Sequence, residues 1–296
     1  MDATKRAYLE LHIAVMLWGL TAILGDLIKL SALNLVWWRV MLTGISLLFF
    51  LRQGRVFWKM PRKSLLKFAF VGMLTGLHWL TWYGAIKLAN ASVALICMAC
   101  VAFFTSLIEP LIMRQKVKGW EIFLGFLIIP GMALIVGSLD VSLRTGFWVG
   151  IFAALIASVF GTLNKKWINE AGPLSITFIE MASAWLFLSL ILPFTLYPDG
   201  AGKLMPTLND FLLLLVLSLL CTTLTWMLAL RALKHLSAFA SNLTTNLEPV
   251  YGILLAWVFL DDRQELSPGF YWGALLILAV VFSYPFLNRK GKKTIT

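Results

Sequence analysis

The amino-acid sequence predicts an all-α integral membrane protein that crosses the bilayer with ten helices. Of its 296 residues, 60% are hydrophobic and only 13% are charged, and the mean hydropathy is +0.86. Soluble domains are about half apolar and about a quarter charged, so this chain has too few polar side chains to cover itself in water. A transmembrane helix needs about 20 apolar residues. Runs of about that length, separated by polar breaks, occur at residues 9–28, 34–51, 66–86, 91–113, 119–137, 146–166, 173–196, 209–232, 236–260 and 268–287.

The lysine and arginine residues predict the orientation of these helices. If the N-terminus is cytoplasmic, nineteen Lys and Arg residues lie in segments on the cytoplasmic side and five on the other side. Cytoplasmic loops of membrane proteins carry an excess of Lys and Arg. We therefore expect a multi-pass protein of the cell (inner) membrane with both termini in the cytoplasm. The same distribution accounts for the formal net charge of +11, so the charge does not indicate a nucleic-acid partner.

An internal repeat predicts how the ten helices are organised. TGLHWLTWYGAIKLANA (75–91) and TTLTWMLALRALKHLSA (222–238), offset by 147 residues, agree at Thr, Leu, Trp, Ala, Lys and Ala. We therefore expect two five-helix domains, residues 1–140 and 141–296. Because five is odd, the second copy enters the membrane from the opposite side. Such inverted repeats are common in secondary transporters, whose substrate site lies near the bilayer midplane between the halves.

Several short motifs resemble the EamA family of the drug/metabolite transporter superfamily. These are Trp18-Gly19 in the first predicted helix, Arg39 early in the second, and EPVYGILLAWVFLDDRQ (248–264) in the ninth. The last run is similar to the family's Pro, apolar run and Leu-Gly-Glu-Arg, with Asp-Asp in place of Gly-Glu. The first half departs further, since LIEPLIMRQKV (107–117) has no Leu-Gly-Glu ending. The resemblance covers essentially the whole chain. It implies two inverted five-helix repeats and the movement, often export, of amino-acid-like or other small organic solutes.

Polar residues in the ninth predicted helix indicate a solute site. Ionisable residues inside a membrane are costly, so each one suggests a function. Glu248 falls at the centre of this helix, and Pro249 is expected to bend the helix beside it. The alternative is that these polar groups only hydrogen-bond neighbouring helices. The predicted site residues here are Asn242, Thr245, Asn246, Glu248 and Tyr251.

Aromatic residues near mid-depth are expected to form the opposite wall of this site. Tryptophan at membrane interfaces serves as an anchor, but that role does not apply at mid-depth. A buried indole also needs a partner for its N–H group, which favours a polar cavity. Packing within the bundle is the alternative for each ring. The residues concerned are Trp18, His78, Trp79, Trp82 and Trp226.

Further buried charges predict one ion pair in each half. Asp26 and Arg39 have similar depths near the outer face, on the rise of a helix. Glu180, in the inner half of its helix, is expected to meet Lys165 or Lys166. We expect these pairs to brace or gate the two mouths of the protein, or else to serve only to neutralise buried charge.

Together these features predict a secondary transporter that exports a small metabolite by alternating access. Glu248 is the candidate proton carrier, because burial favours the neutral form of a carboxyl group. No cofactor or metal is expected, since no His or Cys cluster surrounds Cys97 and Cys100, and the protein is expected to be a monomer or homodimer. The alternatives are a membrane-embedded enzyme acting on a lipid-like substrate, with Asp261 and Asp262 as a metal pair, and a passive channel.

Overall fold

The computed structural model describes residues 2–54, 60–117, 119, 122–123, 127, 130–131, 133–134, 137, 139–195, 204–245, 247–248, 251–252, 255 and 268–291. All regular secondary structure in these ranges is helical. The elements are α1 (Ala3–Leu27), α2 (Ala32–Gly54), α3 (Arg62–Leu88), α4 (Ala91–Met98), α5 (Val101–Met113), η2 (Val141–Leu143), α7 (Arg144–Trp167), α8 (Pro173–Thr195), α9 (Leu208–Leu215), η3 (Val216–Leu224), α10 (Thr225–Leu233), α11 (Ala238–Thr245) and α13 (Pro268–Gly291).

Six helical stretches in the described part of the chain are long and apolar enough to cross a membrane. They are Ala3–Leu27, Ala32–Phe49, Ala91–Met113, Val141–Trp167, Pro173–Phe194 and Leu208–Leu233. α3 is not among them, although it has 27 residues. It is rich in polar and aromatic side chains, including His78 and Trp79, which lower its hydropathy. Together with the composition, these helices make the chain a multi-pass membrane protein.

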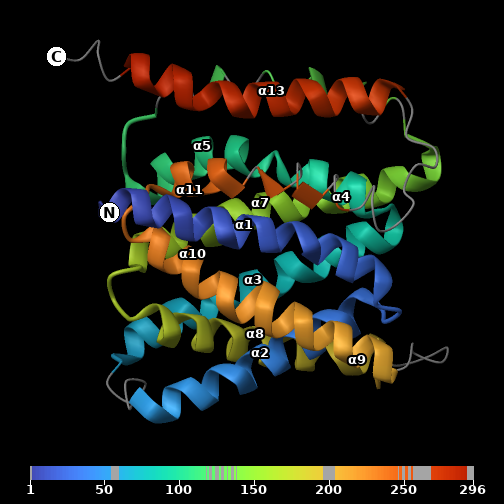
Figure 1. Cartoon of the computed structure of the whole chain (residues 1–296), viewed down its shortest axis with the longest axis vertical. Helices are drawn as coiled ribbons and strands as arrows, with labels where there is room; N and C mark the ends of the chain where they lie inside the picture. The colour runs from blue at the N-terminus through green and yellow to red at the C-terminus, as the bar shows by residue number, and fades with distance from the viewer. Residues whose placement is uncertain are drawn as a thin grey trace.

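The long helices lie side by side, and α1 begins at the same end of the bundle where α13 ends (Figure 1). Basic side chains gather at this end, because several helices begin or end there with Lys or Arg. At the opposite end, acidic and basic residues of the described chain are mixed, as in the loop that contains Lys29. The basic residues at the first end are Lys5, Arg6, Arg62, Lys63, Lys67, Arg114, Lys116, Lys165, Lys166, Arg231 and Lys234.

Two of the expected spans depart from regular α-helix. The run 91–113 is interrupted between α4 and α5, where the N–H groups of Ala99 and Cys100 bond to carbonyl oxygens only three residues back. The run 209–232 contains the π-helical segment η3. Within η3, the hydroxyls of Thr222 and Thr223 donate to carbonyl oxygens five residues back. Segments of π-helix inside α-helices are frequent at functional sites.

A polar contact holds the loop after α7 at the basic end. The carboxylate of Glu170 accepts hydrogen bonds from Lys67 Nζ and from Ser64 Oγ, the latter at 2.6 Å. Both bonds lower the pKa of Glu170 from its usual value, and the bond from Lys67 has the larger effect. Both partners belong to α3, so the contact ties the α7–α8 connection to α3.

Helices α3 and α8 cross closely at Gly72. A Cβ atom at this position would lie 2.3 Å from the backbone oxygen of Glu180, whereas one at Gly44 in α2 would meet nothing within 4 Å. The absence of a side chain at Gly72 therefore lets the backbones of the two helices touch. The crossing also sets the depth at which α8 presents Glu180.

Gly72→Ala is expected to lower the melting temperature of the detergent-solubilised protein, because the added methyl group forces α3 and α8 apart. Overpacking of this kind costs about 1–3 kcal/mol. Gly44→Ala is the matched control and should leave the melting temperature unchanged or slightly higher, since Ala favours helix more than Gly. Equal losses in the two variants would contradict the close crossing.

Glu170→Gln is expected to lower the melting temperature at neutral pH and to have little effect in acid. A carboxyl group whose pKa is lower in the folded state stabilises that state above the unfolded pKa. The contribution begins to fall near pH 4.5, the unperturbed value, and is lost as the pH falls through the lower pKa of the folded state. Melting curves of both proteins between pH 7 and pH 3.5 should therefore converge at the acid end. A constant difference across the range would show that the charge is not involved.

Candidate functional site

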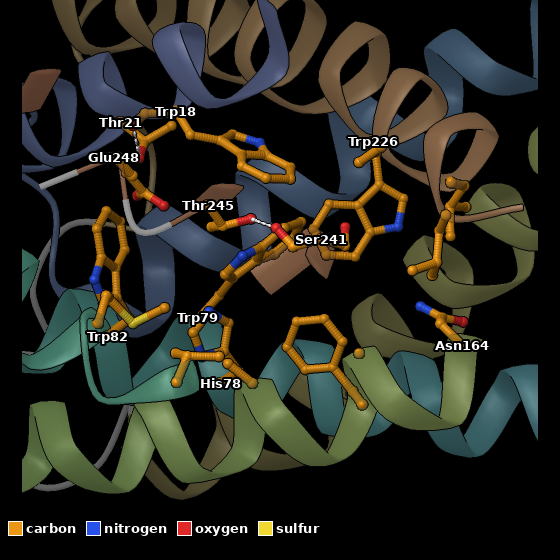
Figure 2. A pocket seen from close by; sticks show the side chains of 18 of the residues that line it. Trp18, Thr21, His78, Trp79, Trp82, Asn164, Trp226, Ser241, Thr245 and Glu248 are labelled. Atoms are coloured by element: carbon orange, nitrogen blue, oxygen red, sulfur yellow. Dashed lines mark hydrogen bonds between the residues drawn. The ribbon is translucent and has the colours of Figure 1, made fainter. Parts of the chain in front are cut away.

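A partly open cavity of about 130 Å³ lies between the helices of the bundle. Figure 2 shows Glu248, Thr21 and Trp82 at one end of it, Asn164 at the other, and the rings of Trp18, Trp79 and Trp226 between them. Helices α1, α3, α7, α10 and α11 contribute most of its wall. The lining residues are Trp18, Thr21, Arg39, His78, Trp79, Trp82, Met98, Val101, Ala157, Phe160, Gly161, Asn164, Trp226, Ala229, Leu230, Leu233, Ala238, Ser241, Thr245 and Glu248.

Trp226 is the centre of the aromatic wall. Its ring centroid lies 5.3 Å from that of Trp79, 5.9 Å from that of Phe160 and 6.2 Å from that of Trp18. The rings of Trp226 and Trp79 meet at an interplanar angle of 71°, an edge-to-face contact. Two of the indole groups are anchored outside the cavity. Trp18 Nε1 donates to Thr225 Oγ1 at 2.9 Å, and Trp226 Nε1 donates to Glu180 Oε2 at 2.8 Å.

Glu248 is the acidic side chain of the cavity wall. It is 6% exposed, and none of the residues that the structure describes donates a hydrogen bond to it or forms an ion pair with it. His78 adds an acceptor to the same wall. Its Nδ1 lies 2.9 Å from the carbonyl oxygen of Ala153, so Nδ1 carries the proton and Nε2 is left as an acceptor. Thr245 and Ser241 bring hydroxyl groups, and Thr245 Oγ1 donates to the backbone oxygen of Ser241 (Figure 2).

Arg39 is the basic side chain of the cavity wall, and it does not pair with Asp26 as expected. Its Nε donates to Thr222 Oγ1 at 2.8 Å and its Nη1 to Tyr83 Oη at 2.9 Å. Its guanidinium carbon lies 3.9 Å from the ring centre of Trp79. The depths of Asp26 and Arg39 along their helices are similar, but Arg39 points into the bundle, towards α3 and η3. Depth alone therefore did not predict its partners.

Glu180 likewise does not pair with Lys165 or Lys166. Its carboxylate is fully buried and bonds to Trp226. The two lysines instead donate to backbone oxygens, Lys165 to Leu233 (2.8 Å) and to Leu236, and Lys166 to Ile112 (3.1 Å). Carbonyl groups at helix C-termini have no partner within the helix and attract cations. The lysines therefore meet this need rather than neutralise Glu180.

Seven of the ten residues expected to bind solute line the cavity. Tyr251 does not: it is half-buried and packs on α1 beside Gly19. The side chain of Asn242 and the whole of Asn246 lie outside the described residues. The seven are Trp18, His78, Trp79, Trp82, Trp226, Thr245 and Glu248.

A model of the EamA-like transporter family matches residues 5–137 and 144–284. The chain belongs to this family. The EamA-like protein is also 25% identical over 193 residues to an "Uncharacterized transporter" from Clostridium kluyveri, a match that covers 62% of this chain and 60% of that protein's length. One crystal structure has the same fold, with a TM-score of 0.70 over 96% of this chain and 98% of that one, at 16% identity. The match spans about three fifths of the relative's own length, and the family and the relative are both described as transporters.

The cavity of this EamA-like protein lies between the two segments that match the family. Arg39 and Trp79 come from the first segment, whereas Phe160, Trp226 and Glu248 come from the second. A side chain moving with one segment therefore changes its distance to the facing wall.

Sequence reasoning missed several residues of the cavity. Asn164 had a usable signal, because it is an amide inside an apolar span, where polar groups mark function or helix contacts. Its Oδ1 and the Nε1 of Trp82 are buried without a hydrogen-bond partner in the described part of the chain. Phe160 and Ser241 gave no such signal, since similar residues occur throughout the chain.

Proposed function

We propose that this EamA-like protein is a secondary transporter that exports a small metabolite, amino-acid-like or a similar small organic solute, by alternating access. The observation that carries the proposal is Glu248, whose carboxyl group faces the cavity with no partner among the described residues. A buried polar group without a partner costs free energy. A bound solute or water supplies the missing hydrogen bonds.

The size of the cavity supports a small solute over a lipid-like one. A cavity of about 150 Å³ in another protein holds one benzene molecule, and the cavity here is of about 130 Å³. The aromatic wall suits the apolar part of such a molecule. A lipid-like substrate needs a much longer channel, which weighs against the membrane-embedded enzyme. The Asp261-Asp262 pair that this alternative requires lies outside the described residues.

The charges of the cavity support an amino-acid-like solute. Arg39 has five N–H groups, of which two make hydrogen bonds in the described structure, so further donors remain for a carboxylate. Glu248 is suited to an ammonium group. A solute carrying both charges compensates two buried charges that are costly on their own.

The proposed cycle uses the two family segments as inverted five-helix repeats, residues 1–140 and 141–296. In this scheme the chain crosses the cell (inner) membrane ten times, so both termini lie on the same side. The basic end of the bundle supports the cytoplasm as that side. Rocking of one repeat against the other opens the cavity to each side in turn. In this scheme Glu248 also carries the coupling proton.

Purified protein in liposomes loaded with unlabelled amino acids is expected to accumulate a labelled amino acid by counterflow, and the rate should saturate. A pH gradient across the liposome is expected to drive net uptake by the wild-type protein. Glu248→Gln should lose the response to the gradient, because the amide cannot release a proton. Solute exchange should be weakened but kept, because the amide oxygen still accepts a hydrogen bond from the ammonium group while the charge is lost. Flux is followed by filtration of labelled solute.

Glu170→Gln is the matched control, since it makes the same chemical change at the membrane surface and should keep the gradient response. A gradient response that survives in Glu248→Gln excludes Glu248 as the proton carrier. Flux that neither saturates nor shows counterflow favours a channel. Metal-dependent turnover of a lipid without solute movement favours the enzyme.

A further inference from the structure

Two tryptophans at equivalent positions of the sequence repeat touch each other in the structure. Trp79 lies on α3, the third long helix of the first family segment, and Trp226 lies on α10, at the end of the third span of the second segment. They are separated by the repeat offset of 147 residues. Their ring centroids are 5.3 Å apart, edge to face. The two halves of the chain therefore meet in the cavity wall through matched residues.

Each of these rings is held by a charged side chain from the helix before it in its own segment. In the first half, Arg39 of α2 places its guanidinium carbon 3.9 Å from the ring centre of Trp79. In the second half, Glu180 of α8 accepts the hydrogen bond of Trp226 Nε1 at 2.8 Å. Both charges are buried, Arg39 at 2% and Glu180 at 0% exposure. The arrangement repeats with the sign of the charge exchanged.

Each charged residue also contacts the opposite half. Arg39 donates to Thr222 of η3 in the second segment, and the backbone of Glu180 lies against Gly72 of α3 in the first. Both ring supports are thus fixed at crossings between the halves. A movement of one half against the other must carry the supports with it.

Simple packing does not account for these side chains. Neither Arg39 nor Glu180 forms an ion pair within the described residues, and a charge in the membrane costs about 2.5–3.5 kcal/mol on insertion scales. An apolar side chain would fill the same space without that cost. What these side chains supply is direction: a cation lies over a ring face, and the single N–H of an indole donates only along its own bond, so its acceptor fixes the orientation of the ring.

We propose that Arg39 and Glu180 are positioning residues that hold Trp79 and Trp226 as a matched pair, and that this pair sets the width of the cavity and so the size of solute accepted. The proposal rests on the proposed function for its effect on solute. Its structural part, the support of each ring by a charge, stands independently.

The first experiment compares Glu180→Gln with Glu180→Leu. Gln keeps an oxygen that accepts the Trp226 N–H, whereas Leu removes it. We expect Glu180→Gln to keep the half-saturation concentration and size preference of counterflow near those of the wild type. Glu180→Leu should raise the half-saturation concentration for a small amino acid about 5–10-fold, with little change in maximal rate, and should admit larger solutes. Equal losses in both variants would overturn the proposal, because they would show that the negative charge of Glu180 matters and its hydrogen bond from Trp226 does not.

A double-mutant cycle tests whether Glu180 acts through Trp226. Trp226→Phe removes the N–H group and keeps an aromatic ring, so it should shift size preference as Glu180→Leu does. The double variant should then lose no more than either single variant, since both remove one interaction. Additive losses would contradict the proposal. Ser189→Ala is the matched control. It removes the acceptor of the Trp37 indole N–H, which lies 2.8 Å from Ser189 Oγ. Trp37 does not line the cavity, so this variant should leave size preference unchanged.

The indole N–H signals of ¹⁵N-tryptophan-labelled protein provide a readout that does not depend on transport. Trp226→Phe and Trp79→Phe identify the two signals by their loss. Glu180→Leu should shift both, because the rings touch, whereas Glu180→Gln should shift mainly that of Trp226. If the Trp79 signal is unaffected by Glu180→Leu, the matched pair is refuted. If the signals behave as expected and no solute shows counterflow, the proposed transport function fails and the support of the rings stands.

Discussion

Charge buried in a membrane-spanning bundle must be compensated where it lies, and Arg39 and Glu180 show how this chain does so. Within the described residues neither meets an opposite charge. Hydroxyl groups, an indole N–H and an aromatic face stabilise them instead. Several neighbouring features serve the same need: η3 brings Thr222 to the guanidinium, and Gly72 lets α8 come close enough to place the carboxylate. Much of the bundle core is therefore organised around these two groups.

The cavity wall also leaves polar groups without partners, as Glu180 does at its second carboxyl oxygen, Oε1. Glu248 faces open space, and Trp82 Nε1 and Asn164 Oδ1 are unsatisfied in the described part of the chain. Unpaired groups are rare in folded proteins and indicate water or a ligand that is not part of the chain. A transporter needs this combination, because a fully satisfied wall has nothing to offer a solute. The anchored rings beside it, such as Trp18 on Thr225, keep the wall in place.

The sequence predicted the membrane class, the family and seven of the residues that line the cavity, but not the partners of buried charges. Hydropathy identified the six spans found among the described residues, because burial in lipid is a property of whole segments. Seven cavity residues were found because mid-depth polar and aromatic side chains have few other uses. Asp26 was paired with Arg39, and Glu180 with lysines, from depth alone. Rotation about each helix axis decides which side chains meet, and it depends on packing against helices distant in the chain. The ten-helix count and the inversion of the repeat stay predictions.

The π-helical segment Val216–Leu224 gives α10 a freedom that a regular helix lacks. Moving its hydrogen-bond register by one residue turns everything that follows through about 100°, the angle per residue of an α-helix, without displacing α9. Thr225 and Trp226 come directly after this segment, so such a step would turn the indole of Trp226 relative to the cavity wall. Trp226 is the one aromatic residue of α10, so the change would fall on a single ring.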